Sequence, residues 1–256
     1  MSLTTSNVHK CFFLDTNIVI SDILNENNPR IEKLKTDAVV HKIPCYISDS
    51  VKTEVEGKVT LTSNFLGEAV RQTVKVAIED DRRNRGVSLD LPMSIYDVRA
   101  LEDLFSICHN TARSNRLSLI KPLNFVEEWA KGFIGDKLNK GDKISVKDFL
   151  IELSKKLLET TSTIEDLYDN LIEFELGHIK TKVVPVNSSL VDIIHNEGVH
   201  TPDDVHVAVA YTYQISNNEK VVFVTQDYGV IDKKTNLFRQ NVVIELSDPL
   251  YAVYYF

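Results

Sequence analysis

Acidic side chains lie at the ends of short apolar segments that are far apart in the sequence, and at the start of one predicted helix. In a parallel sheet, ligands bind beyond the carboxyl ends of the strands, so carboxylates there would converge. Two carboxylates about 5 Å apart repel by roughly 3 kcal/mol at an effective dielectric constant near 20, so a cluster must take up protons or a cation. An oxygen-only cluster suits Mg²⁺ or Mn²⁺, whereas Zn²⁺ is disfavoured because no Cys or His pair has ligand spacing. The candidate residues are Asp15, Glu54, Asp203, Asp204 and Asp227.

Taken singly, each carboxylate also has a structural explanation. Asp15 would favour the start of a following helix through the helix dipole, and Glu54 would face water. The segment Thr201–Asp204 is typical of a helix start, with Thr as N-cap and Pro at the first position. Asp227 would begin a turn, and His206 is expected to pack or to form a hydrogen bond rather than to bind a metal. The set as a whole favours metal chemistry.

The segments around these residues alternate between strands and helices. Short apolar runs predict buried strands, and periodic runs predict helices. The alternation occupies residues 1–58 and 181–256 and predicts an α/β fold, a three-layer α/β/α domain with a central, mostly parallel sheet of about five strands. The expected strands are Cys11–Asp15, Pro44–Ser48, Val183–Val186, Val221–Thr225 and Asn241–Leu246, and the expected helices are Thr16–Leu24, Arg30–His41, Ser50–Lys58, Ser189–Glu197 and Thr201–Ile215.

Residues 59–180 show helical periodicity and no convincing strand, which predicts an all-α insertion in the α/β domain. Phe125, Trp129 and Phe133 recur on one helix face, and we expect them to pack in a core. Arginines and lysines gather locally, so residues 113–147 hold eight basic and four acidic side chains. They are either ordinary solvated helix faces or contacts to nucleic-acid phosphates. The arginine candidates for such contacts are Arg82, Arg83, Arg85, Arg113 and Arg116.

The composition is that of a globular protein: of 256 residues, 43% are hydrophobic and 26% are charged. This excludes a mainly disordered or collagen-like chain. The net charge of -8 offers a nucleic acid no global basic surface. Three cysteines argue against a disulfide framework, and no apolar run approaches the roughly 18 residues that span a bilayer. We therefore expect a reduced, cytoplasmic protein without a membrane segment.

Four segments together resemble the motifs of the PIN-domain ribonucleases. Their order, and their placement on the expected strands and helices, carry the resemblance, which covers about residues 10–58 and 180–246. The helical insertion is not part of the common pattern, and typical members that act as toxins in toxin–antitoxin pairs are much shorter. The four segments are Phe13–Ile20, Ile47–Val55, Asp203–Ala210 and Val221–Asp227.

The resemblance implies a PIN-like fold and a metal-dependent endoribonuclease that hydrolyses RNA phosphodiester bonds and leaves a 5′-phosphate and a 3′-hydroxyl. It implies Mg²⁺ or Mn²⁺ as cofactor, RNA as substrate, and both a homodimer and an antitoxin-like protein inhibitor as further partners. Spacing to Ala208 and Ala210 favours Asp203 over Asp204 as the third acidic residue. The implied catalytic and metal-binding residues are Asp15, Glu54, Asp203 and Asp227, and the supporting residues are Thr16, Asn17, Asp204 and Thr225.

Two other function classes stay open. A PIN-like fold also serves as a non-catalytic module that binds RNA or protein, with the insertion as its working part. A structure-specific DNA nuclease also uses acidic clusters, although the helix-hairpin-helix typical of that class is missing. A haloacid dehalogenase-type phosphatase is disfavoured because Asn17 stands where its second Asp belongs, and no glycine-rich phosphate loop is present.

Overall fold

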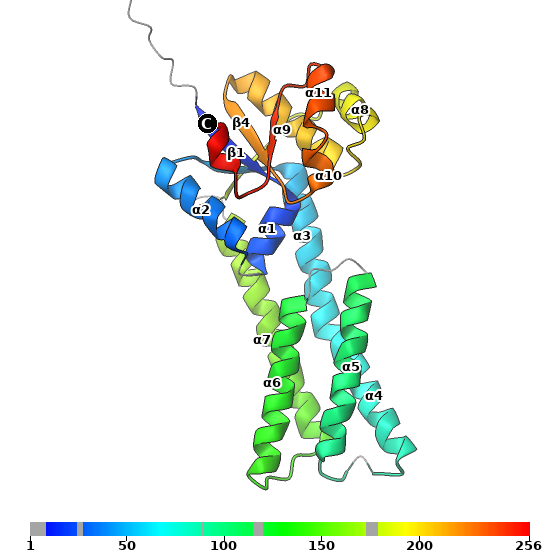
Figure 1. Cartoon of the computed structure of the whole chain (residues 1–256). Helices are drawn as coiled ribbons and strands as arrows, with labels where there is room; N and C mark the ends of the chain where they lie inside the picture. The colour runs from blue at the N-terminus through cyan, green and yellow to red at the C-terminus, as the bar shows by residue number, and fades with distance from the viewer. Residues whose placement is uncertain (1–8, 25–27, 89, 115–119, 173–178) are drawn as a thin grey trace, which may run out of the picture. The chain divides into compact units, whose positions relative to one another are not determined.

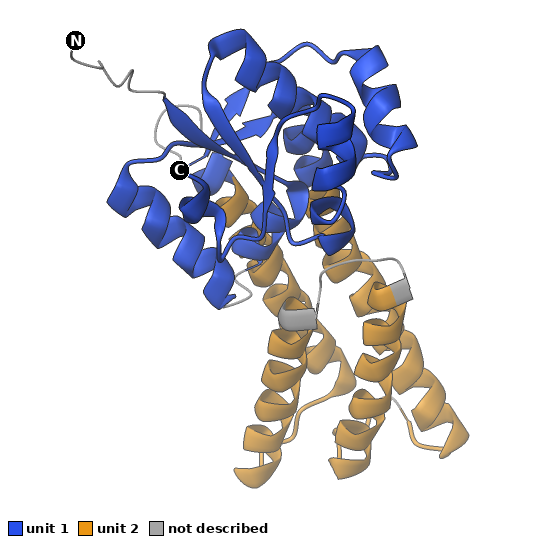
Figure 2. Cartoon of the chain, turned by 45° about the horizontal axis from the view of Figure 1, so that its top comes forward, with its two compact units in different colours: residues 1–57, 169–256 blue, residues 58–168 orange. Residues whose placement is uncertain are grey.

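The computed structural model describes residues 9–24, 28–88, 90–114, 120–172 and 179–256. The chain divides into two compact units, unit 1 with residues 1–57 and 169–256 and unit 2 with residues 58–168 (Figure 2). The insertion was expected to end at residue 180, and this division ends it at residue 168. The reason is that the end of the last helix of the insertion belongs to unit 1, where Leu171 lines an apolar pocket together with Leu14 and Ile18.

Unit 1 contains a five-stranded sheet in which every pairing is parallel, with the strand order β3-β2-β1-β4-β5. The α/β fold expected from the sequence is thereby confirmed. The third expected strand is misplaced: β3 precedes residues 183–186 and pairs with β2. Val183 is 84% exposed, so the apolar run there does not mark a buried strand. The strands are β1 Lys10–Leu14, β2 Cys45–Ser48, β3 Ile179–Lys182, β4 Lys220–Val224 and β5 Glu245–Ser247.

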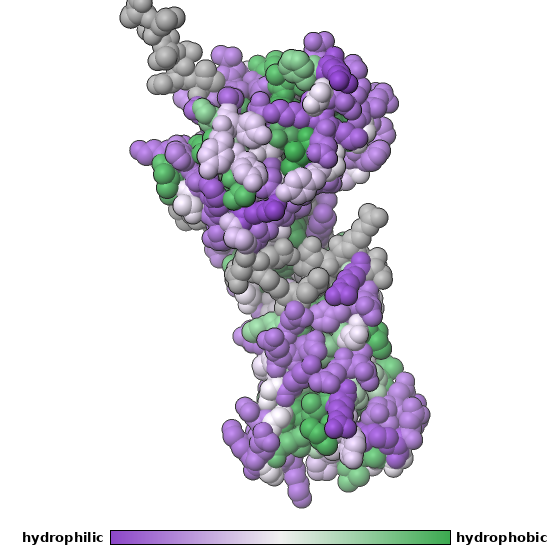
Figure 3. Space-filling view, in the orientation of Figure 1, coloured by the Kyte–Doolittle hydropathy of each residue, from purple (hydrophilic) through white to green (hydrophobic). Residues whose placement is uncertain are grey.

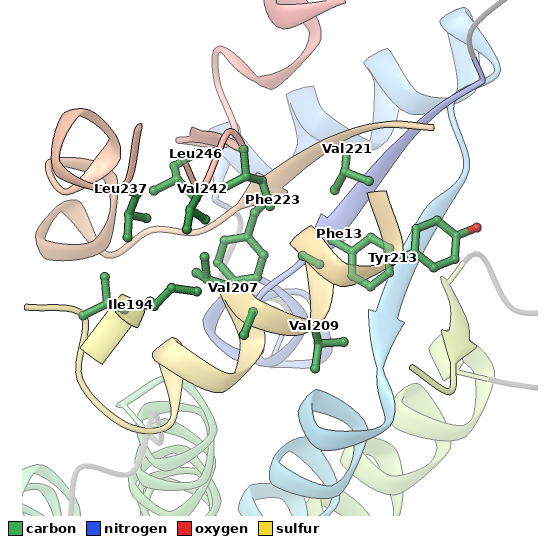
Figure 4. Packing of buried hydrophobic residues seen from close by; sticks show 14 of the residues in the cluster. Phe13, Ile194, Val207, Val209, Tyr213, Val221, Phe223, Leu237, Val242 and Leu246 are labelled. Carbon is green, nitrogen blue, oxygen red and sulfur yellow. The ribbon is translucent and has the colours of Figure 1, made fainter. Parts of the chain in front are cut away.

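Helices cover both faces of the sheet because alternate side chains of each strand point to opposite sides. On one face, Phe13 and Phe223 join the apolar cluster that contains Val207 and Tyr213 of α9, which Figure 4 shows at close range. On the other face, Phe12 contacts the ring of Phe256 at a centroid distance of 5.4 Å. The helices of unit 1 are α1 Thr16–Ile23, α2 Pro29–His41, α3 Asp49–Asn64, α8 Ser188–Asn196, α9 Asp203–Asn217, α10 Tyr228–Ile231, α11 Lys234–Arg239 and the 3-10 helix η2 Ala252–Tyr255, with α3 running on into unit 2 (Figure 1).

In the described part of unit 2 the regular elements are helices, with one isolated bridge between Pro92 and Ser145. Its helix α5 packs beside both α4 and α6. The expected core role of the aromatic stripe on α6 is wrong for Phe125, which is 51% exposed. Trp129 and Phe133 are only half-buried, and their rings stack on each other with centroids 5.2 Å apart. The helices are the π-helix η1 Phe65–Val70, α4 Arg71–Asn84, α5 Ile95–Ser114, α6 Ile120–Asn139 and α7 Val146–Ile172, whose end lies in unit 1.

The surface seen in Figure 3 is mainly hydrophilic, with separate apolar areas on each unit. Among the described residues, no helix combines the length and the apolar character that a bilayer crossing needs.

Candidate metal centre

The candidate centre lies where the direction of chain progression reverses in the sheet. From β1 the chain moves to β2 on one side, and β4 pairs with β1 on the other side. Loops that leave two such neighbouring strands diverge, which opens a crevice at their carboxyl ends. Asp15 directly follows β1, and Thr225 directly follows β4. The carboxyl ends of β1 and β4 are the place where the carboxylates were expected to converge.

Asp15 is 2% exposed and is held in one orientation by several donors. One carboxylate oxygen accepts the backbone N–H of Thr16 at 2.7 Å, so Asp15 also acts as the N-cap of α1. The other oxygen accepts from Asn17 Nδ2 and from Thr225 Oγ1, each at 2.7 Å. Asn17 Oδ1 in turn accepts the backbone N–H of Gln226, which ties α1 to the end of β4. Three of the four residues expected to support the cluster, Thr16, Asn17 and Thr225, therefore form hydrogen bonds with Asp15.

Asp15, Asp203 and His206 form a group that could hold a metal ion. One ligand atom from each residue lies within 4.8 Å of the others. His206 is 2% exposed, and its Nδ1 lies 3.4 Å from Asp15 Oδ1 but forms no hydrogen bond with any described residue. A buried ring nitrogen without such a partner is costly, and coordination of a cation would remove the cost.

Glu54 reaches the same centre from α3. Its Oε2 accepts from Thr16 Oγ1 at 2.7 Å and lies 3.6 Å from His206 Nε2. The side chain of Glu54 is 25% exposed, so it stands between the buried group and solvent. Glu54 is thus placed to bind a ligand water or to take a proton, rather than to lie within the compact group itself.

The two adjacent acids at the start of α9 have separate roles. Asp203 joins the candidate centre, whereas Asp204 is 1% exposed and accepts from His195 Nδ1 and Thr201 Oγ1, each at 2.9 Å. The helix begins at Asp203, and Pro202 is its N-cap. The expectation that Thr201 caps this helix is wrong, because the Thr201 hydroxyl donates to Asp204 instead. Asp204 supports the centre only by anchoring the first turn of α9.

Asp227 lies at the exposed edge of the centre. It is the N-cap of α10, and its Oδ1 accepts the backbone N–H of Gly229 at 2.7 Å. Its own backbone N–H donates to Thr225 Oγ1 at 3.0 Å. Asp227 is near enough to repel Asp203 electrostatically, but it is outside the compact group.

The pKa of Asp203 is raised to about 6. The largest cause is burial, which disfavours the charged carboxylate, followed by repulsion from Asp15. Asp227 and Glu54 add further repulsion, while His206 acts in the opposite direction. The crevice therefore concentrates negative charge that a divalent cation would neutralise.

Replacing Asp203 with Asn should stabilise the metal-free protein at pH 7.5 by about 1 kcal/mol. The folded chain holds the Asp203 proton more tightly than the unfolded chain, so stability falls as the pH rises from about 3.8 to about 6 and stays lower above it. A pKa rise of this size corresponds to a destabilisation of the folded protein by about 3 kcal/mol. Solvent screening and the favourable position of a carboxylate at a helix N-terminus reduce this value. Urea denaturation in EDTA at pH 7.5 and pH 4.5 measures the difference in the free energy of unfolding between the variant and wild type. This difference should be smaller at pH 4.5. If the variant were less stable than wild type at pH 7.5, the charged Asp203 carboxylate would not be destabilised by burial and by the neighbouring carboxylates.

The arginines expected to contact phosphates differ in their surroundings. For Arg82 the expectation is wrong, because its side chain is 0% exposed and bonded to Asp97. Arg83 is 76% exposed and pairs with Asp80, and Arg85 pairs with Asp81 and Asp97. Two further candidates were named: Arg113 is exposed, and Arg116 lies outside the described residues.

His206 was expected to pack or to form a hydrogen bond, and the structure places it in the group that could hold a metal ion. It lies three positions after Asp203 on α9, and residues three apart share a helix face. That spacing is visible in the sequence and puts an imidazole beside the Asp203 carboxylate, but it does not by itself distinguish packing from metal binding.

The chain was compared with protein-family models, with curated proteins and with solved structures, and none of the three comparisons gave a match.

Proposed function

We propose that the protein is a metal-dependent endoribonuclease that hydrolyses RNA phosphodiester bonds in the crevice at the carboxyl ends of β1 and β4. The observation that carries the proposal is the grouping of Asp15, Asp203 and His206 within 4.8 Å, with a buried imidazole nitrogen that has no hydrogen-bond partner among the described residues. The resemblance of four sequence segments to PIN-domain ribonucleases supports RNA as the substrate.

The donor set fits a divalent cation. Asp15 and Asp203 supply carboxylate oxygens and His206 supplies a nitrogen, while Glu54 borders the group. An imidazole in the set favours Mn²⁺ over Mg²⁺, because Mg²⁺ prefers oxygen ligands. When bound, the ion would lower the pKa of a water molecule and neutralise charge that develops on the phosphate.

The chain's own residues perform the remaining tasks. Thr16, Asn17 and Thr225 hold the carboxylate of Asp15 through short hydrogen bonds, so its position is fixed before any ligand arrives. Glu54 is partly exposed and is placed to accept a proton from an attacking water. Asp227 stands at the solvent edge, where a substrate would enter.

The test is the cleavage of an end-labelled pool of single-stranded RNA by the purified full-length protein. We expect cutting with Mn²⁺, weaker cutting with Mg²⁺ and none in EDTA, with products that carry a 5′-phosphate. Single-stranded DNA and DNA flaps of equal length serve as competing substrates. Preferential cutting of flaps would favour the DNA nuclease instead.

A metal titration separates inactivity from a wrong site. Isothermal titration with Mn²⁺ should show binding by the wild type even if the RNA pool lacks the preferred substrate. Absence of both metal binding and cleavage would overturn the proposal and favour the non-catalytic module.

A further inference from the structure

Unit 2 carries a groove of about 700 Å³ between α4 and α7, which the candidate metal centre does not use. Both walls are regular helix faces. From α4 come Arg71 and Lys75, one turn apart, and from α7 come apolar residues and lysines between Val146 and Leu158. At about 1.5 Å per residue, the α7 wall is about 18 Å long, which matches a helix of about twelve residues.

The α7 side of the groove carries apolar side chains that are partly open to solvent. Leu158 is 67% exposed and Ile151 is 45% exposed, with Leu150 beside them. Aliphatic side chains in a concave groove gain free energy when a partner removes them from water. This row at positions 150, 151 and 158 provides anchoring contacts for apolar side chains on one face of a partner helix.

The charge of the groove is mainly positive. Arg71, Lys75 and Lys147 are exposed and have no ion pair among the described residues, and Lys155 pairs only with Glu152, outside the lining. Two acidic residues also line the groove, so it carries four basic and two acidic side chains. The excess of cations beside the apolar side chains selects a partner with acidic flanks.

We infer that this groove is a docking site for an acidic amphipathic helix of a partner protein. Leucine-like side chains of that helix would cover Leu150, Ile151 and Leu158, and its glutamates or aspartates would pair with Arg71, Lys75 and Lys147. RNA fits less well, because none of the described residues that line the groove is aromatic and able to stack on bases, and two carboxylates would repel the phosphates.

The probe is a fluorescein-labelled 14-residue peptide with leucines at positions i, i+3, i+4, i+7 and i+11 and glutamates on both flanks. Fluorescence anisotropy with the full chain, in EDTA and without RNA, measures its affinity. Arg71→Glu combined with Lys75→Glu should weaken binding at least tenfold, and Leu158→Ser should weaken it severalfold. A peptide with lysines in place of the glutamates should not bind measurably.

Matched variants control for folding and for net charge. Lys140→Glu with Lys143→Glu makes the same charge change at exposed lysines outside the groove, and Leu167→Ser removes an exposed leucine elsewhere on α7. Both should bind the peptide as wild type does.

Three results would overturn the inference. A scrambled peptide that binds equally well would show that no helix face is recognised. If the Arg71/Lys75 double variant bound the peptide with wild-type affinity, the peptide would not bind in the groove. A 12-nucleotide single-stranded RNA that displaces the peptide and loses affinity in the same variant would make the groove a nucleic-acid surface. Because none of these measurements involves cleavage, they stand apart from the proposed ribonuclease activity.

Discussion

Asp15→Asn should reduce Mn²⁺-dependent RNA cleavage by between about a hundredfold and a thousandfold. The change removes one negative charge from the centre of the candidate site while keeping the size of the side chain. Asn still caps α1, because its carbonyl oxygen can accept the backbone N–H of Thr16. Mn²⁺ affinity, measured by isothermal titration, should fall in parallel with the cleavage rate.

The amide of Asn at position 15 faces donors from Asn17 and Thr225, so some loss of stability accompanies the change. Asp203→Asn resolves this ambiguity, because that variant is expected to be more stable than wild type in EDTA and yet to lose cleavage and Mn²⁺ affinity. Asp232→Asn is the matched control, since it removes an exposed carboxylate of unit 1 that is outside the group. Full cleavage by both the Asp15 and Asp203 variants would place the activity elsewhere.

The central strands were predictable because their side chains are buried on both faces. Apolar runs at residues 11–14 and 221–224 are almost completely buried in β1 and β4. The edge strand β3 was not predictable in this way, because only Ile179 of its four residues is buried. Its position depends on hydrogen bonds to β2, which leave no hydrophobic pattern.

The candidate site was predictable as far as it depends on strand ends. Asp15 could be placed from the end of β1, whereas the choice between Asp203 and Asp204 depended on the direction of two side chains on one helix turn. The structure separates them through His195 and Thr201, which hold Asp204 away from the group. Both partners lie within nine residues of Asp204, but the direction of each side chain is set by the turn between α8 and α9 and not by the hydrophobic pattern.

Arg82 shows a signal that was present in the sequence. Val74, Ile78 and Arg82 follow one another at intervals of four residues, and all three are buried on one face of α4. The neighbours Arg83 and Arg85 made the segment look like a solvated basic cluster. The helical period places Arg82 in the core and Arg83 on the surface.

The fully buried Arg82 makes a hydrogen-bond network whose loss should have a large effect on stability. It donates to both carboxylate oxygens of Asp97, at 3.0 and 3.1 Å, and Asp97 is 1% exposed. Burial alone would raise the pKa of Asp97, but hydrogen bonds from Arg82 and Ser94 hold it below its ordinary value. Arg82 also donates to the backbone carbonyls of Ser88, Leu91 and Pro92, which fixes the connection from α4 to α5.

Arg82→Met should therefore destabilise the protein by about 3 kcal/mol or more, because it removes a buried cation that donates to a buried carboxylate and to three backbone carbonyl oxygens. Arg85 still reaches Asp97 at 2.8 Å, which keeps the loss near the lower end of the range for broken buried pairs. Urea denaturation followed through the single tryptophan, Trp129, reports on unit 2 directly. Arg83→Met is the matched control and should cost less than about 0.5 kcal/mol, since its pair with Asp80 is exposed. Adding Asp97→Leu to Arg82→Met should recover only part of the loss, because the carbonyl oxygens of Leu91 and Pro92 still lack the donor that Arg82 supplies. Equal stability of the Arg82 and Arg83 variants would refute a stabilising role for the network.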